Sequence, residues 1–564
     1  MEALDWLVIG VFFLALIGII VWVVRQKQND SADYFLGGRD ATWLAIGASI
    51  FASNIGSEHL IGLAGAGASS GMAMAHWEIQ GWMILILGWV FVPFYTRSMV
   101  YTMPEFLERR YNPQSRTILS VISLVSYVLT KVAVTVYAGG LVFQQVFGIK
   151  ELWGIDFFWI AAIGLVVLTA LYTIFGGMKS VLYTSVLQTP ILLLGSLIIL
   201  VLGFKELGGW DEMMRVCGAV TVNDYGDTMT NLIRSNDDAN FPWLGALIGS
   251  AIIGFWYWCT DQFIVQRVLS GKNEMEARRG TIFGAYLKLL PVFLFLIPGM
   301  IAFALPQKYI GPGGEGFLPM LANGTANADA AFPTLVAKLL PAGVKGLVVC
   351  GILAALMSSL ASLFNSSAML FTIDFYKRFK PETPEKKLVG IGQIATIVIV
   401  VLGILWIPIM RSVGDVLYTY LQDVQSVLAP GIAAAFLLGI CWKRTSAQGG
   451  MWGLISGMVI GLTRLGAKVY YSNAGEVADS TFKYLFYDMN WLFFCGWMFL
   501  FCIIVVIVVS LATEAPTAEK IQGLVFGTAT KEQKAATRAS WNHWDIIHTV
   551  IILAITAAFY WYFW

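Results

Sequence analysis

Long apolar runs separated by short polar segments dominate the hydropathy pattern of this chain of 564 residues. A helix that crosses a membrane needs about 20 mainly apolar residues. Fourteen segments come close to or exceed that length, so we predict an all-α membrane protein with 14 transmembrane helices. The predicted spans are 4–24, 42–70, 77–96, 117–147, 155–174, 183–206, 243–266, 280–306, 346–374, 388–410, 416–442, 449–472, 489–512 and 545–563.

Lys and Arg are unevenly divided between the two sets of connecting segments, and 23 of the 36 fall on one side of the predicted bilayer. Basic residues favour cytoplasmic loops, so we assign that side to the cytoplasm. Both termini are then expected outside the cytoplasm. A short interfacial helix at 103–111 and a polar linker at 514–542 are predicted on the cytoplasmic side, and longer loops at 207–242 and 307–345 on the outer side.

The composition excludes several classes of protein. Hydrophobic residues make up 58% of the chain and charged residues 13%, about half the charge of an average soluble domain. A net charge of +1 offers no basic field to nucleic acid. The six cysteines show no CxxC spacing, so no disulfide scaffold is expected. The expected macromolecular surroundings are therefore the lipid bilayer, and nothing in the sequence indicates an oligomeric state.

Two of the predicted spans carry polar residues where they would meet the middle of the bilayer. The first has Asn54, Glu58 and His59, and the second has Thr260 and Asp261. Such residues persist where they face a bundle interior or a water-filled cavity, and interrupted helices free backbone carbonyls for an ion. The alternative is that the Gly and Ser residues around them only allow tight helix packing.

The spacing of these two broken helices predicts an inverted repeat. They are five spans apart, and an odd offset means that they cross the membrane in opposite directions. Many secondary transporters have this architecture, with substrate and ion at the midplane between the repeats. One membrane domain is expected, with the parts 1–41 (first helix and cytoplasmic loop), 42–206 (first five-helix repeat), 207–242 (outer loop), 243–442 (second repeat) and 443–564 (three extra helices).

Several stretches resemble the sodium/solute symporter family, and most closely its sodium/glucose cotransporter branch. The resemblance implies a leucine-transporter-like 5+5 inverted-repeat core with four extra helices, and sodium-driven sugar uptake by alternating access. The matching stretches are DYFLGGR (33–39), GASIFASNIGSEHLIGLAG (47–65), WVFVPFY (89–95), YTMPEFLERRY (101–111), WYWCTDQFIVQRVLSGKN (256–273), LKLLPVF (287–293), LMSSLASLFNS (356–366) and FLLGICWKR (436–444).

The resemblance implies a sugar site and its gates. A hexose needs polar side chains for its hydroxyls and an aromatic platform for its apolar face. Glu78 and Lys288 could instead pair structurally, His59 could be a packing histidine, and the gate residues could belong to the core. The implied substrate-binding residues are Asn54, His59, Glu78, Tyr257, Trp258, Lys288 and Gln422. The implied gates are Leu63, Trp77 and Tyr418, with Tyr257 as the inner gate.

The family's main sodium site is matched by three backbone carbonyls and two hydroxyls. Sodium is a hard cation that prefers oxygen ligands. The alternative is that the serines bond back to their own helix. Some relatives hold a second sodium with an aspartate and a hydroxyl, and this chain has Ser185 and Ala361 there, so we predict one sodium per sugar. The implied ligands are the carbonyls of Ala52, Ile55 and Ala355 and the hydroxyls of Ser358 and Ser359.

The identity of the sugar stays open at the level of sequence. Glucose and galactose differ in one hydroxyl, and GSEHL with HWE also resembles inositol-transporting members, so myo-inositol is the nearest competitor. A sugar sensor or channel on the same scaffold is the second alternative. The role of Asp261 is open between helix capping and ligand contact.

An enzyme is not expected. The stretch Gly67–Gly71 matches G-x-S-x-G but ends a membrane helix rather than forming a strand-to-helix elbow. The compact loops and the lack of a signal-peptide pattern in the first span indicate a plasma membrane of bacterial type, the inner membrane.

Overall fold

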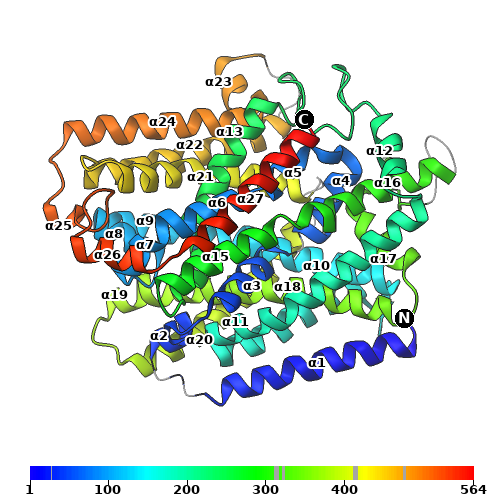
Figure 1. Ribbon diagram of the computed structural model, residues 1–564, viewed down its shortest axis with the longest axis horizontal. Coiled ribbons are helices and arrows are strands. Elements are labelled where there is room, and N and C mark those ends of the chain that lie inside the picture. The colour runs from blue at the N-terminus through cyan, green and yellow to red at the C-terminus, as the bar shows by residue number, and fades with distance from the viewer. Residues whose placement is uncertain are drawn as a thin grey trace.

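The structure, a computed structural model, is almost entirely helical. Its helices run roughly along the long axis of the molecule (Figure 1). Within residues 1–564 it describes all but 27, 29, 57, 310–316, 321–323, 411–416 and 474–477, and the side chains at 129, 307–309, 409–410, 417–421 and 473 are likewise outside the description.

Polar side chains begin many of the helices in the first half of the chain. Thr102 accepts a hydrogen bond from the amide of Glu105, and Asn112 from that of Ser115, as N-cap residues do. The helices are α1 (Ala3–Val24), α2 (Ser31–Leu36), α3 (Trp43–Asn54), α4 (Ala64–Ser70), α5 (Ala75–Glu78), α6 (Gly81–Ile86), α7 (Val92–Ser98), α8 (Met103–Arg110), α9 (Pro113–Ser126), α10 (Ala133–Phe147), α11 (Phe157–Leu207) and α12 (Trp210–Gly218), and β1 (Glu151–Leu152) pairs with β2 (Ile155–Asp156). Wider π-helical turns join several of them, at Glu58–Leu63, Leu87–Phe91 and Tyr127–Val132.

The second half follows the same construction. Asn273 caps α15 and Asn542 caps α27. The helices are α13 (Trp243–Gly254), α14 (Gln262–Leu269), α15 (Glu274–Lys288), α16 (Ile297–Tyr309), α17 (Ala331–Leu339), α18 (Val344–Met369), α19 (Lys377–Phe379), α20 (Glu385–Met410), α21 (Leu417–Cys441), α22 (Ala447–Asn473), α23 (Thr481–Lys483), α24 (Trp491–Ala512), α25 (Ala518–Ile521), α26 (Lys531–Ala539) and α27 (His543–Tyr562). Its π-helical turns are Phe255–Thr260, Val292–Leu296, Leu370–Tyr376 and Tyr484–Asp488.

Eleven helical stretches in the described part of the chain are long and apolar enough to cross a membrane. The predicted spans 155–174 and 183–206 both fall within α11, which continues through them for 51 residues except at Gly177, where the backbone is not helical (φ 53°, ψ −147°). The predicted start at 155 is wrong by two residues, because Ile155 and Asp156 form a strand and the helix begins at Phe157. The predicted interfacial helix at 103–111 is present as α8.

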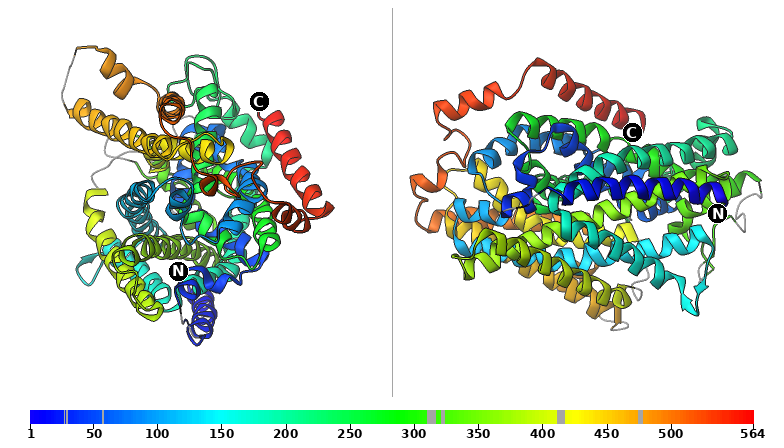
Figure 2. Two further views of the ribbon diagram at one scale, coloured as in Figure 1. Left: turned by 90° about the vertical axis from the view of Figure 1, so that its left-hand side faces the viewer. Right: turned by 90° about the horizontal axis from the view of Figure 1, so that it is seen from below.

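The helices at the two ends of the chain lie on the outside of the bundle. In α1, only 22% of an apolar segment of 18 residues is buried, and the share in α27 is the same. In the stretch Val344–Phe379, which begins with α18, the buried share of such a segment is 89%. α18 therefore lies at the centre, where it packs against α11 and α3. Figure 2 shows α1 and α27 on the periphery of the bundle.

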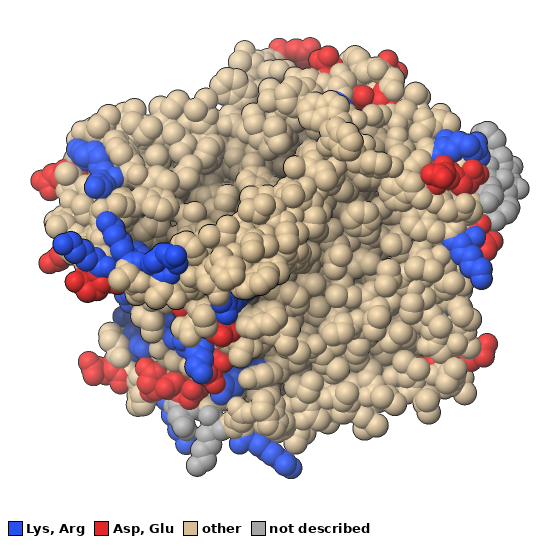
Figure 3. Space-filling model, in the orientation of Figure 1, with Lys and Arg blue, Asp and Glu red and all other residues tan. Residues whose placement is uncertain are grey.

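Most of the charged side chains visible in Figure 3 lie toward the two ends of the long axis, and a further acidic group lies along the top edge. The connecting segments with α8, α25 and α26 lie at one end, and those with α12 and α17 at the other (Figure 1). The face between them carries few charged side chains (Figure 3). This distribution is the one expected for a bundle whose middle lies in hydrocarbon.

Candidate functional site

A break divides the first polar span into two half-helices. α3 ends at Asn54, Ile55 is extended (φ −78°, ψ 103°), and helical structure resumes at Glu58. The amide of Ile55 still bonds to the carbonyl of Phe51. No hydrogen bond to the carbonyl oxygens of Ala52 or Ile55 is found among the described residues. Those two oxygens are thus available to an ion.

The central helix α18 runs directly beside this break. The hydroxyls of Ser53 and Ser362 are 2.6 Å apart. A Cβ on Gly56 would lie 2.9 Å from Ser359 Oγ, so the serine hydroxyl faces the interrupted segment. Ser358 lies next to it and is 3.2 Å from the hydroxyl of Ser185 on α11. This all-oxygen donor set is compatible with a hard monovalent cation.

The second polar span is broken in a comparable way. The π-helical turn Phe255–Thr260 ends at Asp261, which is extended (φ −76°, ψ 126°) before α14 begins. Asp261 accepts a hydrogen bond from the amide of Phe263 at 3.3 Å, and it pairs with Lys131 at 2.7 Å. The carboxylate also accepts from the hydroxyl of Tyr127. It therefore both caps α14 and holds a lysine.

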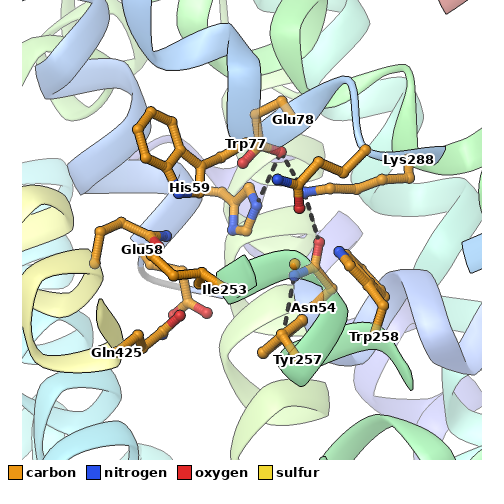
Figure 4. A pocket seen from close by; sticks show the side chains of 13 residues that line it. Asn54, Glu58, His59, Trp77, Glu78, Ile253, Tyr257, Trp258, Lys288 and Gln425 are labelled. Carbon is orange, nitrogen blue, oxygen red and sulfur yellow. Dashed lines mark hydrogen bonds and ion pairs between the residues drawn. The ribbon is translucent and has the colours of Figure 1, made fainter. Parts of the chain in front are cut away.

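A pocket lies between the two breaks, enclosing about 430 Å³ of empty space including its opening. Figure 4 shows its lining side chains converging from several different helices. The lining residues are Asn54, Glu58, His59, Trp77, Glu78, Gln80, Ile253, Gly254, Tyr257, Trp258, Lys288, Gln422 and Gln425.

A chain of charged and polar contacts crosses one wall of the pocket (Figure 4). Glu78 Oε2 is 2.6 Å from Lys288 Nζ and 3.2 Å from His59 Nε2. Lys288 also donates to Asn54 Oδ1 at 3.2 Å, and Asn54 Nδ2 donates to the hydroxyl of Tyr257 at 3.1 Å. The pairing compensates part of the cost of burying the carboxylate and the ammonium. It also fixes donors and acceptors in positions where a ligand with several hydroxyls can meet them.

Two polar atoms of the lining have no partner in the described part of the chain. They are Trp77 Nε1, a donor, and Gln422 Oε1, an acceptor, and both are buried. Buried polar groups are hydrogen-bonded in the large majority of cases. A ligand that both accepts and donates hydrogen bonds would satisfy this pair of atoms, as a sugar or polyol does.

Comparison with known proteins decides the family. The profile of the sodium:solute symporter family matches residues 34–457. This chain belongs to that family. Sodium is accordingly the coupling ion of this membrane-embedded symporter, and the members of the family are transporters.

The symporter has curated relatives over most of its length. It is 36% identical to the sodium/myo-inositol cotransporter 2 of Homo sapiens over 542 residues, covering 94% of this chain and 79% of the relative. It is also 36% identical to the sodium/glucose cotransporter 4 of Danio rerio over 537 residues, covering 92% and 80%.

A solved structure of a Na+-coupled sialic acid symporter has the same fold. Its TM-score against this chain is 0.72 at 21% identity, covering 92% of this chain and 99% of the other. Two further solved structures resemble the chain more distantly, with TM-scores of 0.46 and 0.47.

The structure brings together all seven side chains that the sequence predicted for the sugar site. Of the predicted gates, Trp77 lines the pocket and stacks on Trp491 with ring centres 5.5 Å apart. Tyr257 lines the pocket and also contacts Lys131, whose ammonium is 4.8 Å from the ring centre. Leu63 is fully buried without lining the pocket. The side chain of Tyr418 lies outside the described residues.

The sequence indicated no functional role for two residues that line the pocket, Glu58 and Ile253, and it did not show what the absence of a side chain at Gly254 allows. Glu58 was recognised as polar at mid-depth but received no role, and Ile253 was not singled out. A Cβ on Gly254 would lie 2.4 Å from Gln80 Oε1, so the glycine makes room for the glutamine, which donates to Ser250 O at 2.8 Å. No periodicity signals this exchange of volume between two helices.

Proposed function

We propose that this symporter drives the uptake of a hexose, glucose or galactose or both, by alternating access and with one sodium per sugar. The observation that carries the proposal is the pocket wall of Glu78, Lys288 and Asn54, together with the two buried atoms that lack partners, Trp77 Nε1 and Gln422 Oε1. Sugar hydroxyls can donate to the carboxylate and to Gln422, and their oxygens can accept from the indole and the ammonium.

The aromatic residues suit the apolar face of a sugar ring. Tyr257 and Trp258 lie edge to face with ring centres 4.9 Å apart, and both line the pocket. Stacking of a pyranose on one of them would bury the ring's C–H groups while its hydroxyls meet the polar wall. In this proposal Tyr257 also closes the inner side and Trp77 the outer side, with Leu63 and Tyr418 completing the outer gate.

We assign the sodium to the carbonyls of Ala52, Ile55 and Ala355 and the hydroxyls of Ser358 and Ser359. The free carbonyls at the break and the serine hydroxyl facing Gly56 support the assignment. Sodium bound there would join the α3 half-helix to α18, so its arrival would favour one arrangement of the two. Ala361 has no side-chain oxygen, and Ser185 donates its hydroxyl to Val181 O at 2.6 Å, which supports a single sodium.

We further propose 14 spans with a 5+5 inverted-repeat core. The repeats are 42–206 and 243–442, as predicted from the sequence. The remaining parts are the first helix with its cytoplasmic loop (1–41), the outer loop (207–242) and the three extra helices (443–564). The two helical breaks, one at Ile55 and one at Asp261, support the pairing of the repeats. Both termini would lie outside the cytoplasm, and the membrane would be a bacterial plasma membrane.

Sodium-coupled uptake of myo-inositol is the second candidate. It is favoured by the name of the human relative, and by Glu58, which adds a further carboxylate to the pocket. The same scaffold could also serve as a sugar sensor that binds without transport.

A competition series separates the candidate substrates. Purified protein in proteoliposomes would take up one labelled sugar in the presence of unlabelled glucose, galactose, mannose or myo-inositol, with sodium and with choline in its place. The proposal predicts that glucose or galactose competes at the lowest concentration. Strongest competition by myo-inositol would replace the hexose with the second candidate, and binding without accumulation would indicate a sensor.

A further inference from the structure

Two carboxylates, Glu58 and Glu78, are among the described residues that line the pocket. Of these, only Glu58 has no role in the proposed hexose site. We propose that it is a cation-attracting residue that raises the affinity of the adjacent site for sodium. It would do so by facing the sugar pocket on one side and the sodium site on the other. The inference rests on the sodium site assigned under the proposed function, and it adds a residue that is not among the expected ligands.

The pairing of charges around the pocket singles Glu58 out. Glu78 is paired with Lys288 and His59, and Asp261 is paired with Lys131. Glu58 has no ion pair in the part of the chain that the structure describes, and its side chain lines the pocket in a half-buried position. In Figure 4 no dashed line reaches it, and it lies across the cavity from Lys288. A carboxylate without a counter-charge at membrane depth marks an ion path more often than a structural contact.

Gly56 shows how near this carboxylate is to the expected sodium ligands. A Cβ on Gly56 would lie 3.0 Å from Glu58 Oε2 and 2.9 Å from Ser359 Oγ. The carboxylate oxygen and the serine hydroxyl therefore border the same small space, which the absence of a side chain at Gly56 leaves open. A sodium ion held by Ser359 would be within a few ångströms of the negative charge.

The physical effect differs for the two substrates. The carboxylate attracts the sodium ion directly, because no paired cation lies between them among the described residues. Two unit charges a few ångströms apart attract by more than the roughly 1.4 kcal/mol that corresponds to a tenfold change in affinity, even at an effective dielectric constant near 20, so a gain of at least about tenfold is expected. The sugar is neutral and gains no such term. Glu58 should therefore have a large effect on the sodium concentration that the transporter needs, and only a small effect on the affinity for sugar.

A purely structural role makes a different prediction. Glu58 is the first residue of the helix that resumes after the break, and a negative charge stabilises a helix N-terminus through the helix dipole. In that case its removal would lower the melting temperature by the same amount with and without sodium. The dependence of stability on sodium concentration separates the two roles.

The test is a sodium titration of thermal stability without sugar, on the full-length protein in detergent. Choline chloride keeps the ionic strength constant, because screening would otherwise change with sodium. A ligand that binds only the folded state raises the melting temperature with its concentration. Glu58→Gln is expected to need about tenfold more sodium for the half-maximal shift, and Glu58→Asp less than about threefold more, since it keeps the charge. Equilibrium binding of labelled sugar at saturating sodium is expected to stay within threefold of the wild type for Glu58→Gln.

The matched control is Glu382→Gln, which removes the same charge from an exposed loop position and should leave the sodium titration unchanged. Should Glu58→Gln not yield folded protein, Glu58→Ala takes its place with the same expected shift. A variant that lacks the carboxylate but keeps the wild-type half-saturation for sodium overturns the inference. So does a loss of stability that is equal at all sodium concentrations. If sodium does not stabilise the wild type at all, the sodium site of the proposed function fails, and that result is distinguishable from the other two.

Discussion

At the scale of single residues, a buried ion pair holds the pocket together. Glu78 is fully buried and Lys288 is 3% exposed, so removing one partner leaves the other charge buried without its opposite charge. Breaking such a pair from one side costs about 3–5 kcal/mol, because a charge is left buried alone, whereas replacing both partners is often neutral. The pair therefore contributes to stability only as a unit.

This gives the first prediction. Glu78→Gln should lower the melting temperature strongly and abolish sugar binding, since it leaves the Lys288 ammonium without its carboxylate. The double variant Glu78→Gln/Lys288→Met should recover most of the stability but not the binding. Thermal melts and equilibrium binding of labelled sugar measure the two effects separately. A double variant as unstable as the single one, or one that still binds sugar, would contradict the assignment.

The second prediction concerns the serines of α18. Ser359→Ala should raise the sodium concentration for half-maximal stabilisation at least tenfold, since it removes a proposed ligand. Ser367→Ala is the control on the same helix. Its hydroxyl is buried without a partner in the described structure, so its loss should be close to neutral. Equal sodium titrations for the two variants would refute the role of Ser359.

Most residues of the proposed sugar site could be predicted because they lie in stretches that resemble the symporter family, as Asn54, Tyr257 and Lys288 do. Composition and periodicity alone would have given only polar residues in membrane spans. The role of Glu58 could not be predicted in the same way. It lies at a helix break, where helical periodicity no longer says which way a side chain points, so only the structure reveals its proximity to Ser359.

At the scale of helices, α4 packs closely against α16 and the π-helical turn that precedes it. A Cβ on Gly299 would lie 1.9 Å from the carbonyl oxygen of Ala64, and a Cβ on Gly67 would lie 2.2 Å from that of Leu296. The two backbones touch at both positions, as small residues allow in membrane bundles. This contact fixes the half-helix that follows the first break against α16.

The third prediction follows from this contact. Gly299→Ala should destabilise the protein by about 1–3 kcal/mol, as overpacking does in other tightly packed interiors, because the backbone of α4 cannot move aside as a flexible side chain could. Gly164→Ala in α11 is the control, since nothing lies within 4 Å of the added methyl group there. Thermal melts in the same detergent give the comparison. A harmless Gly299→Ala would show that the helices are not in this contact.

Helix boundaries were predictable only where polar residues interrupt the apolar pattern. The pattern placed a loop between residues 174 and 183, but the chain there continues as helix except at Gly177, where a Cβ would lie 2.4 Å from the carbonyl of Tyr34. Close approach of a distant segment decided that break, and hydropathy does not record it. The hairpin of β1 and β2 was missed for a similar reason, since two-residue strands leave no period.

At the scale of the whole molecule, charge distribution and family agree on a membrane transporter. The apolar middle and the charged ends of the bundle follow from the hydropathy pattern, and the all-helical class was predictable from it. The substrate was not, because glucose, galactose and myo-inositol present similar sets of hydroxyls to a polar pocket.

The fourth prediction concerns orientation. In right-side-out vesicles, a tag fused after Trp564 should react with a membrane-impermeant reagent. Cys441, the one exposed native cysteine in the described structure, is first replaced by serine. A cysteine then introduced as Lys534→Cys, between α25 and α27 in the proposed cytoplasmic linker, should react only after the membrane is made permeable. The opposite pattern would reverse the topology, because the excess of Lys and Arg on one side sets the expected direction.

The measurement that tests the central claim most directly is sugar accumulation in proteoliposomes under imposed sodium and voltage gradients. One sodium per sugar contributes about 2.3 kcal/mol from 100 mV and about 1.4 kcal/mol from a tenfold sodium gradient, which limits accumulation to a few hundred-fold. We predict uphill uptake that stops when choline replaces sodium, and a reversal potential corresponding to a one-to-one ratio. Uptake that is unaffected by the replacement of sodium would contradict sodium-driven sugar transport, and a two-to-one ratio would contradict the single sodium site.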